Sequence, residues 1–251
     1  MSKHLALWST LFLLHALSAR AQAPLAIVAG DSLARDYINP TVNIQGWGYE
    51  LPRYFGPGLA WRNDGWGGES TTSFIAEGRW ANTLAAKPRF ILIMFGTNDC
   101  CEAGQYADPN TTYRTNLHQM ITDARAIGAE PILVQSPPIR TPDYDGVHVL
   151  SPGFVAPWAQ AAAEQGAEDG VPVVILYDDL LAIYENLGQQ QAQILFGLDN
   201  PPGSPDLLHF NPYGAEWIAQ QIVKQLPGMA PDLAAYLVTT KPVPTFPYEA
   251  H

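Results

Sequence analysis

Three side chains in two distant segments could together cleave an ester. The first segment is an apolar run, residues 25–29, that leads directly into Gly30-Asp31-Ser32. The second contains Asp206 and His209, three positions apart. A serine hydroxyl needs a neutral imidazole within hydrogen-bond reach to act as a nucleophile, and the imidazole needs an acceptor that fixes its tautomer. The pattern predicts Ser32 as nucleophile, His209 as general base and Asp206 as the carboxylate that orients His209.

Each segment also has a simpler explanation. A serine after a buried strand often caps a helix, and an aspartate and a histidine at this spacing are common by chance. Catalysis is favoured because both segments are predicted at one edge of a sheet. The Gly30-Asp31-Ser32 turn is expected to feed a helix at the carboxyl end of the first strand, and Asp206 and His209 are expected in a loop just before the last helix.

Two loops between these segments could supply donors for an oxyanion. Residues 63–70 include Gly68, and glycine lets a backbone N–H approach a substrate oxygen closely. Residues 96–99 include Asn98, whose side-chain amide is a further donor. Taken alone, the pattern of the first loop is equally typical of an ordinary glycine turn, and that of the second is equally typical of an Asx turn or a helix cap. Four such signals at the same predicted edge favour an active site over coincidence.

Strand and helix patterns alternate along the chain, which predicts parallel β/α units. Apolar runs indicate further buried strands over residues 59–62, 89–95, 131–135 and 171–177. Helical patterns cover part of 46–55, the region around 117–124, residues 155–165, and a last helix with Asn211 as its cap and Pro212 in its first position. We therefore expect one α/β domain over residues 22–251, with a proline-rich tail from about residue 228 that lacks regular structure.

The four blocks together resemble those of the SGNH (GDSL-type) hydrolases. They are Gly30-Asp31-Ser32, Gly68, Gly96-Thr97-Asn98-Asp99 and Asp206-x-x-His209, and the match extends to about Leu226. The resemblance implies a three-layer αβα sandwich with a flavodoxin-like five-stranded parallel sheet. It also implies that the backbone N–H groups of Ser32 and Gly68 and the side chain of Asn98 bind the oxyanion. The α/β-hydrolase elbow is not matched, because Ala34 stands where its second glycine would be.

Within that superfamily the chain is most similar to rhamnogalacturonan acetylesterases and related secreted carbohydrate acetylesterases. The block Asn63-Asp64-x-x-Gly67-Gly68-x-Ser70 carries this likeness. Thr97 departs from it, since those enzymes tend to have histidine between the glycine and the asparagine. The candidate substrate contacts are Thr97 and Trp66, which is flanked by glycines beside the expected oxyanion donors, although core packing is the more common role for any one tryptophan.

These observations predict a serine esterase that removes acetyl groups from a plant cell-wall polysaccharide, with rhamnogalacturonan, a pectin, as first choice. An alternative keeps the triad but changes the substrate to lipid esters or thioesters. A third interpretation is a carbohydrate-binding protein on an inactive hydrolase scaffold. No histidine, cysteine or carboxylate pattern has metal-ligand spacing, so we expect no metal and no cofactor.

The chain has 251 residues and a net charge of −11, which disfavours nucleic acid and anionic membrane surfaces as partners. Residues 1–21 resemble a secretory signal peptide, with Lys3 and His4, an apolar stretch over 5–17, and Ala19-Arg20-Ala21 as cleavage site. An uncleaved anchor is the alternative. We expect a secreted, extracellular monomer whose partner is its acetylated polysaccharide substrate.

Two further sites follow from local sequence. Cys100 and Cys101 are adjacent, so a disulfide between them is sterically demanding but feasible, and their spacing fits neither a redox nor a zinc motif. Asn110 begins the sequon Asn110-Thr111-Thr112, which predicts a glycosylated surface loop in a secreted chain.

Overall fold

The computed structural model describes residues 22–38, 43–139, 154–199 and 204–238. Its centre is a parallel sheet with strand order β2-β1-β3-β4-β5. The strands are β1 (Leu25–Gly30), β2 (Ala60–Asn63), β3 (Phe90–Met94), β4 (Glu130–Val134) and β5 (Val173–Val174). The five-stranded parallel sheet predicted from the sequence is thereby confirmed, and its order is the flavodoxin-like one.

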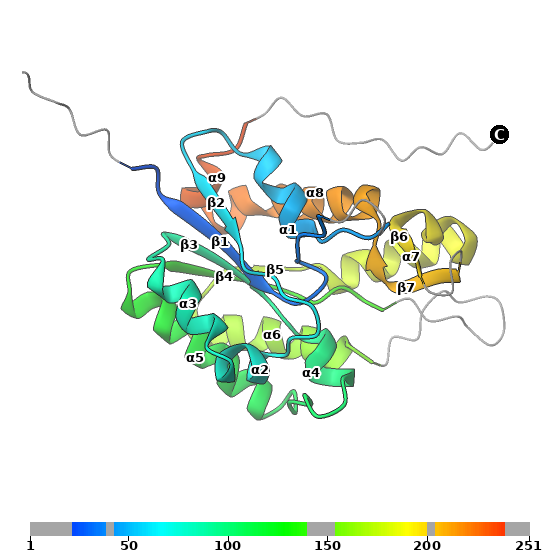
Figure 1. Cartoon of the computed structure of the whole chain (residues 1–251), viewed down its shortest axis with the longest axis horizontal. Helices are drawn as coiled ribbons and strands as arrows, with labels where there is room; N and C mark the ends of the chain where they lie inside the picture. Colours follow the sequence, from blue (N-terminus) through cyan, green and yellow to red (C-terminus); the bar gives the residue numbers. More distant parts are fainter. Residues whose placement is uncertain (1–21, 39–42, 140–153, 200–203, 239–251) are drawn as a thin grey trace, which may run out of the picture.

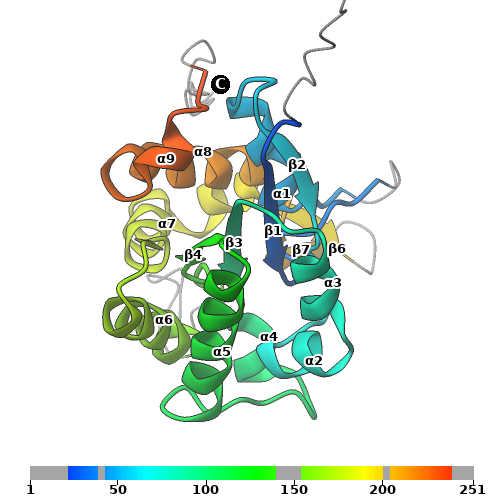
Figure 2. The same ribbon diagram turned by 90° about the vertical axis from the view of Figure 1, so that its left-hand side faces the viewer.

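Helices cover both faces of this sheet (Figure 1). One layer contains α1 (Trp47–Glu50), a 3-10 turn (Leu51–Tyr54), α7 (Tyr177–Ala192), α8 (Pro212–Met229) and α9 (Pro231–Ala234). The other contains α2 (Thr71–Ala76), α3 (Arg79–Ala85), α5 (Thr112–Ala126) and α6 (Ala156–Asp169), with the short α4 (Thr97–Cys101) at one end. Figure 2, viewed nearly along the strands, shows the three layers.

Burial on both faces explains the unbroken apolar runs of the central strands. In β1, Val28 packs into the core cluster beneath α1 and α8, whereas its neighbour Ala29 packs into the cluster beneath α5. In β3, Leu92 and Ile93 divide between the two clusters in the same way. Alternate side chains of a strand point to opposite faces, so a strand between two helical layers is apolar at every position.

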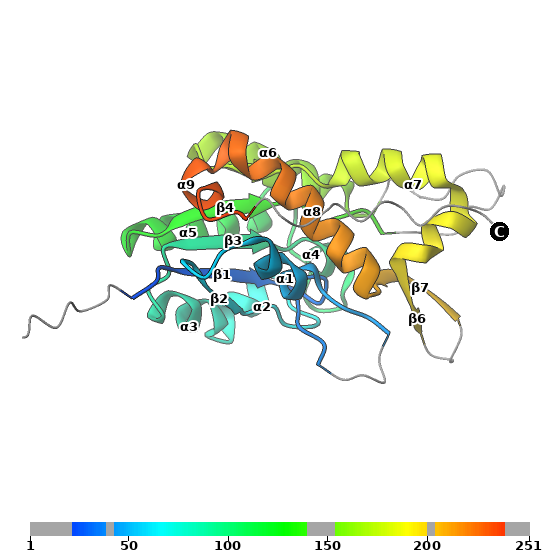
Figure 3. The same ribbon diagram turned by 90° about the horizontal axis from the view of Figure 1, so that it is seen from above.

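The carboxyl ends of β1, β2 and β3 lie at one edge of the sheet, because these strands are parallel and in register. The turn after Gly30, the loop after Asn63 and the turn after Met94 therefore meet there. A separate antiparallel pair, β6 (Phe196–Asp199) and β7 (Ser204–Phe210), lies beyond the same edge and leads into α8 (Figure 3).

Local details differ from the sequence expectations in four places. Residues 31–34 form a turn, and the next helix begins only at Trp47, so Ser32 does not lie at a helix N-terminus. The strand expected over 171–177 is limited to Val173–Val174, because Tyr177 already begins α7. Asp206 and His209 lie in strand β7, and not in a loop. The tail contains the short helix α9, although we expected no regular structure after about residue 228.

Several predictions fall outside the described residues, including the signal peptide over 1–21 and the end of the proline-rich tail. Within the described ranges, none of the helices combines the length and hydrophobicity that crossing a bilayer requires.

Candidate active site

Ser32 occupies a tight turn whose shape is fixed by hydrogen bonds to the backbone. The backbone N–H of Leu33 donates to Oδ1 of Asp31 at 2.9 Å, and the N–H of Ala34 donates to the Asp31 carbonyl at 3.2 Å. Asp31 is fully buried, and Ser32 is 6% exposed. The buried aspartate therefore holds the turn, while the serine hydroxyl lies at the border between the core and the site.

The β6–β7 pair brings His209 to this turn. Nε2 of His209 lies 3.1 Å from Oγ of Ser32, and Nδ1 lies 2.9 Å from Oδ2 of Asp206. A backbone hydrogen bond holds the end of β7, the strand that contains Asp206 and His209, because the N–H of Gln45 donates to the carbonyl of Phe210 at 2.7 Å. Asn211 caps α8 by accepting from the N–H of Gly214, so the helix start holds the end of β7 in place.

The Asp206 carboxylate is held in its charged form. Its burial by itself would raise its pKa, but hydrogen bonds from the His209 side chain and from the backbone N–H groups of His209 and Leu208 outweigh this, and the pKa is lowered. The backbone N–H of His209 donates to Oδ1 of Asp206 at 2.8 Å, and that of Leu208 donates to the same oxygen at 2.7 Å. An ionised, immobilised carboxylate is what a histidine base requires of its partner.

The two loops expected to supply oxyanion donors lie beside Ser32. Backbone hydrogen bonds join the first loop to β1, since Trp66 donates to the Gly30 carbonyl at 2.9 Å. A Cβ added to Gly67 would lie 3.9 Å from Cβ of Ser32, which places the loop against the serine. Gly68 follows with a φ of +80°, a conformation that favours glycine.

Asn98 lies in the first turn of α4, after β3. One N–H of its side-chain amide is used, because Nδ2 donates to the Glu69 carbonyl at 2.9 Å. A primary amide has two N–H donors, so this bond fixes the orientation of the group and leaves the second N–H for another acceptor. The bond also joins the second loop to the first.

Two buried carboxyl groups lie behind the site. Burial raises the pKa of Asp31 to about 7 and that of Asp99 to about 6. Asp99 accepts hydrogen bonds from the backbone N–H and the hydroxyl of Thr71, which connects α4 to α2. Near neutral pH Asp31 is therefore partly protonated, whereas Asp99 is mostly ionised. Sequence reasoning gave neither of them a role beyond the motif.

The two candidate substrate contacts have unequal environments. Thr97 is 3% exposed, and its hydroxyl hydrogen-bonds with that of Ser136 at 2.7 Å, so its side chain supports the turn after β3 and is not free to contact a substrate. Trp66 is 46% exposed. The guanidinium carbon of Arg79 lies 4.1 Å from the centre of the Trp66 ring, and that of Arg35 lies 5.2 Å from it. A sugar that stacked on the Trp66 ring would therefore compete with these arginines for its faces.

The adjacent cysteines and the predicted glycosylation sequon both lie in the segment between β3 and α5. Cys100 and Cys101, at the end of α4, are bonded to each other. Asn110 is exposed in the turn before α5, where its backbone N–H donates to Asp108. Among the described residues, no cluster of three or more histidine, cysteine or acidic side chains could hold a metal ion.

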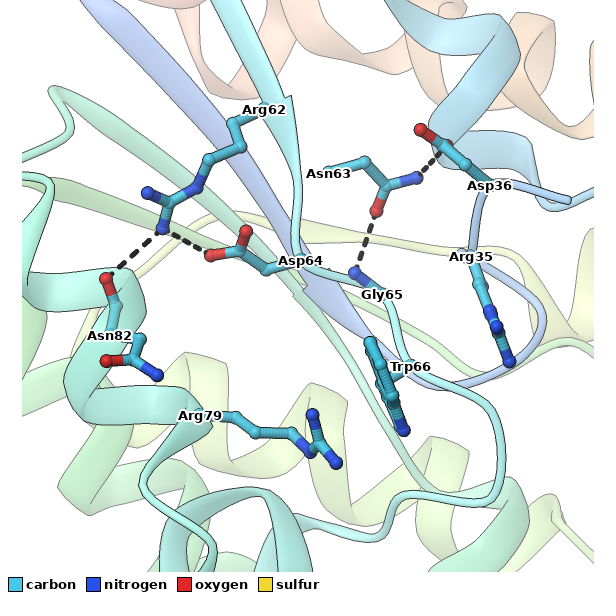
Figure 4. Close-up of a pocket in the computed structure, with 9 residues that line it drawn as sticks. All are labelled: Arg35, Asp36, Arg62, Asn63, Asp64, Gly65, Trp66, Arg79 and Asn82. Carbon is cyan, nitrogen blue, oxygen red and sulfur yellow. Dashed lines mark hydrogen bonds and ion pairs between the residues drawn. The ribbon is translucent and has the colours of Figure 1, made fainter. Parts of the chain in front are cut away.

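An open pocket of about 470 Å³ adjoins the Ser32 turn (Figure 4). Its lining comes from the turn after β1, from β2 with the loop that follows it, and from α3: Arg35, Asp36, Arg62, Asn63, Asp64, Gly65, Trp66, Arg79 and Asn82. Sequence reasoning missed the three arginines, because they are separated along the chain and only the fold gathers them. The one local signal was the position of Arg35, three residues after Ser32.

Comparison with known proteins gives consistent results. The GDSL-like lipase/acylhydrolase family matches residues 28–217. Rhamnogalacturonan acetylesterase RhgT of Bacillus subtilis is 29% identical over 223 residues, which cover 84% of this chain and 93% of that protein. YesY of the same organism, described as a probable rhamnogalacturonan acetylesterase, is 30% identical over 202 residues, covering 78% of this chain and 89% of YesY.

A solved structure supports the fold. Protein YXIM from Bacillus subtilis superposes with a TM-score of 0.69 at 23% sequence identity. The alignment covers 82% of this chain and 57% of YXIM, so the chain spans little more than half of that protein.

Proposed function

Because the chain belongs to the GDSL-like lipase/acylhydrolase family, we propose that Ser32, His209 and Asp206 hydrolyse acetyl esters of a plant cell-wall polysaccharide, most specifically rhamnogalacturonan. The observation that carries the chemistry is the pair of distances around the His209 ring, 3.1 Å to the Ser32 hydroxyl and 2.9 Å to the Asp206 carboxylate. The enzyme class, a carbohydrate acetylesterase that hydrolyses carboxylic esters, agrees with that of its relatives.

The reaction proceeds in two halves. Nε2 of His209 accepts the hydroxyl proton as Oγ of Ser32 attacks the acetyl carbonyl, and Nδ1 donates to Asp206 throughout. The carbonyl oxygen becomes an oxyanion that accepts hydrogen bonds from the backbone N–H groups of Ser32 and Gly68 and from the side chain of Asn98. The bond between the carbonyl carbon and the sugar oxygen then breaks, His209 protonates that oxygen to give the free sugar hydroxyl, and an acetyl-serine remains. Water, deprotonated by His209, releases acetate and restores Ser32.

Support for a carbohydrate substrate comes from two directions. RhgT, named for rhamnogalacturonan deacetylation, aligns with 84% of this chain, so the likeness extends well beyond the catalytic blocks. In addition, the pocket beside Ser32 is lined mainly by charged and polar side chains, which suits a hydrated sugar better than an acyl chain. A lipid ester or thioester would require an apolar groove to hold its chain.

The setting of the enzyme is part of the proposal. The pattern in residues 1–21 supports secretion, and cleavage after Ala21 would release an extracellular protein. On that proposal Asn110, exposed before α5, becomes a glycosylation site. The protein acts as a monomer on its polysaccharide, without a cofactor.

Acetate release from a panel of acetylated substrates tests this proposal. We expect the purified protein to release acetate from acetylated rhamnogalacturonan faster than from acetylated xylan or mannan. We also expect it to cleave 4-nitrophenyl acetate much faster than the butyrate ester. Ser32→Ala should abolish both activities while the circular dichroism spectrum stays unchanged.

Three results would contradict the proposal. Full activity of Ser32→Ala would rule out the nucleophile. A preference for long acyl chains would favour a lipid esterase. Binding of pectin without acetate release would favour the inactive carbohydrate-binding scaffold.

A further inference from the structure

The pocket beside Ser32 contains a stack of two cations around an aromatic ring, defined here as the Arg35–Trp66–Arg79 stack. Figure 4 shows the Trp66 side chain between the two arginines. We propose that this stack is a subsite for a sugar carboxylate, in which Arg35 binds the carboxylate of a galacturonate unit next to the acetylated sugar. The inference rests on the proposed function and assigns residues to substrate recognition.

Arg35 is the arginine of this pocket whose charge is not neutralised. Arg62 forms an ion pair with Asp64, and Arg79 forms ion pairs with Glu69 at 2.8 Å and Glu77 at 2.9 Å. Among the described residues, no ion pair or hydrogen bond of the Arg35 guanidinium is found. Arg35 is therefore the one cation lining the described pocket that no carboxylate pairs with, while Asp36, which lines the same pocket, accepts a hydrogen bond from Asn63.

Two aromatic rings lie near the Arg35 guanidinium. Its carbon lies 5.2 Å from the centre of the Trp66 ring and 5.3 Å from that of Tyr37. Stacked aromatic rings contact the flat faces of a guanidinium and hold the side chain in place. A guanidinium has five N–H donors in one plane, and aromatic rings accept none of them as a carboxylate does, so Arg35 still has donors for a bidentate carboxylate.

Arg35 lies close to the reacting serine. It follows Ser32 by three residues, and its backbone N–H donates to the Ser32 carbonyl at 3.4 Å. A Cβ added to Gly67 would lie 3.1 Å from Nη1 of Arg35 and 3.9 Å from Cβ of Ser32. The guanidinium and the serine are therefore both next to Gly67, and a carboxylate at Arg35 would be held beside an ester at Ser32.

Charge explains why such a subsite is needed. The whole chain carries −11, so its overall field repels a polyanionic pectin. Exposed charges are screened over about 8 Å at physiological ionic strength, so a substrate carboxylate interacts mainly with the charges next to it and less with the overall field. An unpaired arginine beside Ser32 gives a substrate carboxylate an attractive contact there.

The experiment compares two forms of one substrate: acetylated galacturonate oligosaccharides with free carboxylates, and the same oligosaccharides with methyl-esterified carboxyls. We expect the wild-type protein to prefer the free acid in kcat/KM, and Arg35→Gln to reduce that preference about tenfold or more, chiefly through KM. Arg35→Lys keeps the charge without the bidentate geometry and should fall in between. Activity on 4-nitrophenyl acetate normalises each variant.

Arg89→Gln is the matched control. Arg89 precedes β3 at the opposite edge of the sheet and forms ion pairs with Asp232 and Glu130. Its replacement changes the net charge by the same amount, and we expect the preference for free carboxylates to stay as in the wild type. An unchanged preference in Arg35→Gln, or a wild-type protein that does not prefer the free acid, overturns the inference.

Calorimetry with unacetylated trigalacturonate separates this subsite from the proposed function. If the protein releases no acetate from any polysaccharide, the proposed function fails, and binding alone decides the subsite. Trigalacturonate binding that weakens about tenfold in Arg35→Gln supports the subsite. The absence of binding to the wild-type protein, or equal binding to Arg35→Gln, rejects it.

Discussion

Oγ of Ser32 and Nε2 of His209 lie 3.1 Å apart although 177 positions separate them in the chain. The sheet supplies one partner, in the turn after β1, and the β6–β7 pair supplies the other. The hydrogen-bond distance is within the range that proton transfer requires. The proposed chemistry therefore depends on how firmly the β6–β7 pair is attached to the sheet edge.

The first prediction concerns the carboxylate behind His209. In Asp206→Asn the amide oxygen can still accept from the backbone N–H groups of Leu208 and His209, but the negative charge that stabilises the imidazolium is lost. We expect kcat on 4-nitrophenyl acetate to fall by about 10²–10⁴-fold with little change in KM. Asp179→Asn, in the exposed first turn of α7, is the matched control and should retain full activity. An Asp206→Asn protein that keeps wild-type turnover would exclude Asp206 from the mechanism.

The second prediction concerns the amide of Asn98. Removing one preorganised donor typically costs about 10²–10³-fold in turnover, so Asn98→Ala should lower kcat by that factor while KM changes little. Asn116→Ala provides a control, because its amide donates to the hydroxyls of Thr71 and Thr72. That variant should lose melting temperature without a comparable loss of kcat. Equal effects of the two substitutions would mean that Asn98 acts only through stability.

Much of this arrangement could be predicted because the decisive signals are local. Residues 90–94 are apolar at every position since both faces of β3 are buried, and such a run can be recognised without knowledge of its neighbours. Asn211 and Pro212 marked the start of α8 correctly for the same reason, because helix caps use adjacent residues. Strand parallelism then placed the turns after β1, β2 and β3 at one edge.

The features that were missed depend on contacts between distant segments. Asp206 and His209 form part of a strand because β7 pairs with β6, and nothing within 206–209 reveals that partner. Arg35 and Arg79 are separated by 44 positions, yet both lie near the Trp66 ring. Thr97 was a candidate substrate contact because it stands where similar enzymes tend to have histidine, but the fold directs its hydroxyl to Ser136.

The third prediction concerns the close approach of two loops. A Cβ at Gly65 would lie 2.8 Å from the backbone nitrogen of Arg35 and 2.9 Å from the carbonyl carbon of Ala34, so Gly65→Ala must displace the loop from the Ser32 turn. We expect lower kcat together with a lower melting temperature. Gly58→Ala is the control, since its added methyl would lie 3.7 Å from the Tyr236 ring, an ordinary contact. If both variants behave like wild type, the two loops are not held together as described.

The fourth prediction concerns the pH dependence of stability. Burial raises the pKa of Asp31 from its ordinary 3.8 to about 7. Between these values the folded protein keeps a proton that the unfolded chain has lost, so the free energy of unfolding falls as the pH rises from about 4 to 7. In Asp31→Asn this loss is absent. The melting temperature should then vary less between pH 5 and pH 8, by several degrees, since about 1 kcal/mol corresponds to roughly 2–4 °C in a domain of this size.

Asp99 keeps part of the pH dependence of stability in that variant, because burial raises its pKa to about 6. Calorimetric melting curves recorded across this pH range measure the effect, and curves for Asp31→Asn that run parallel to those of the wild type would show that Asp31 is ionised in the folded protein.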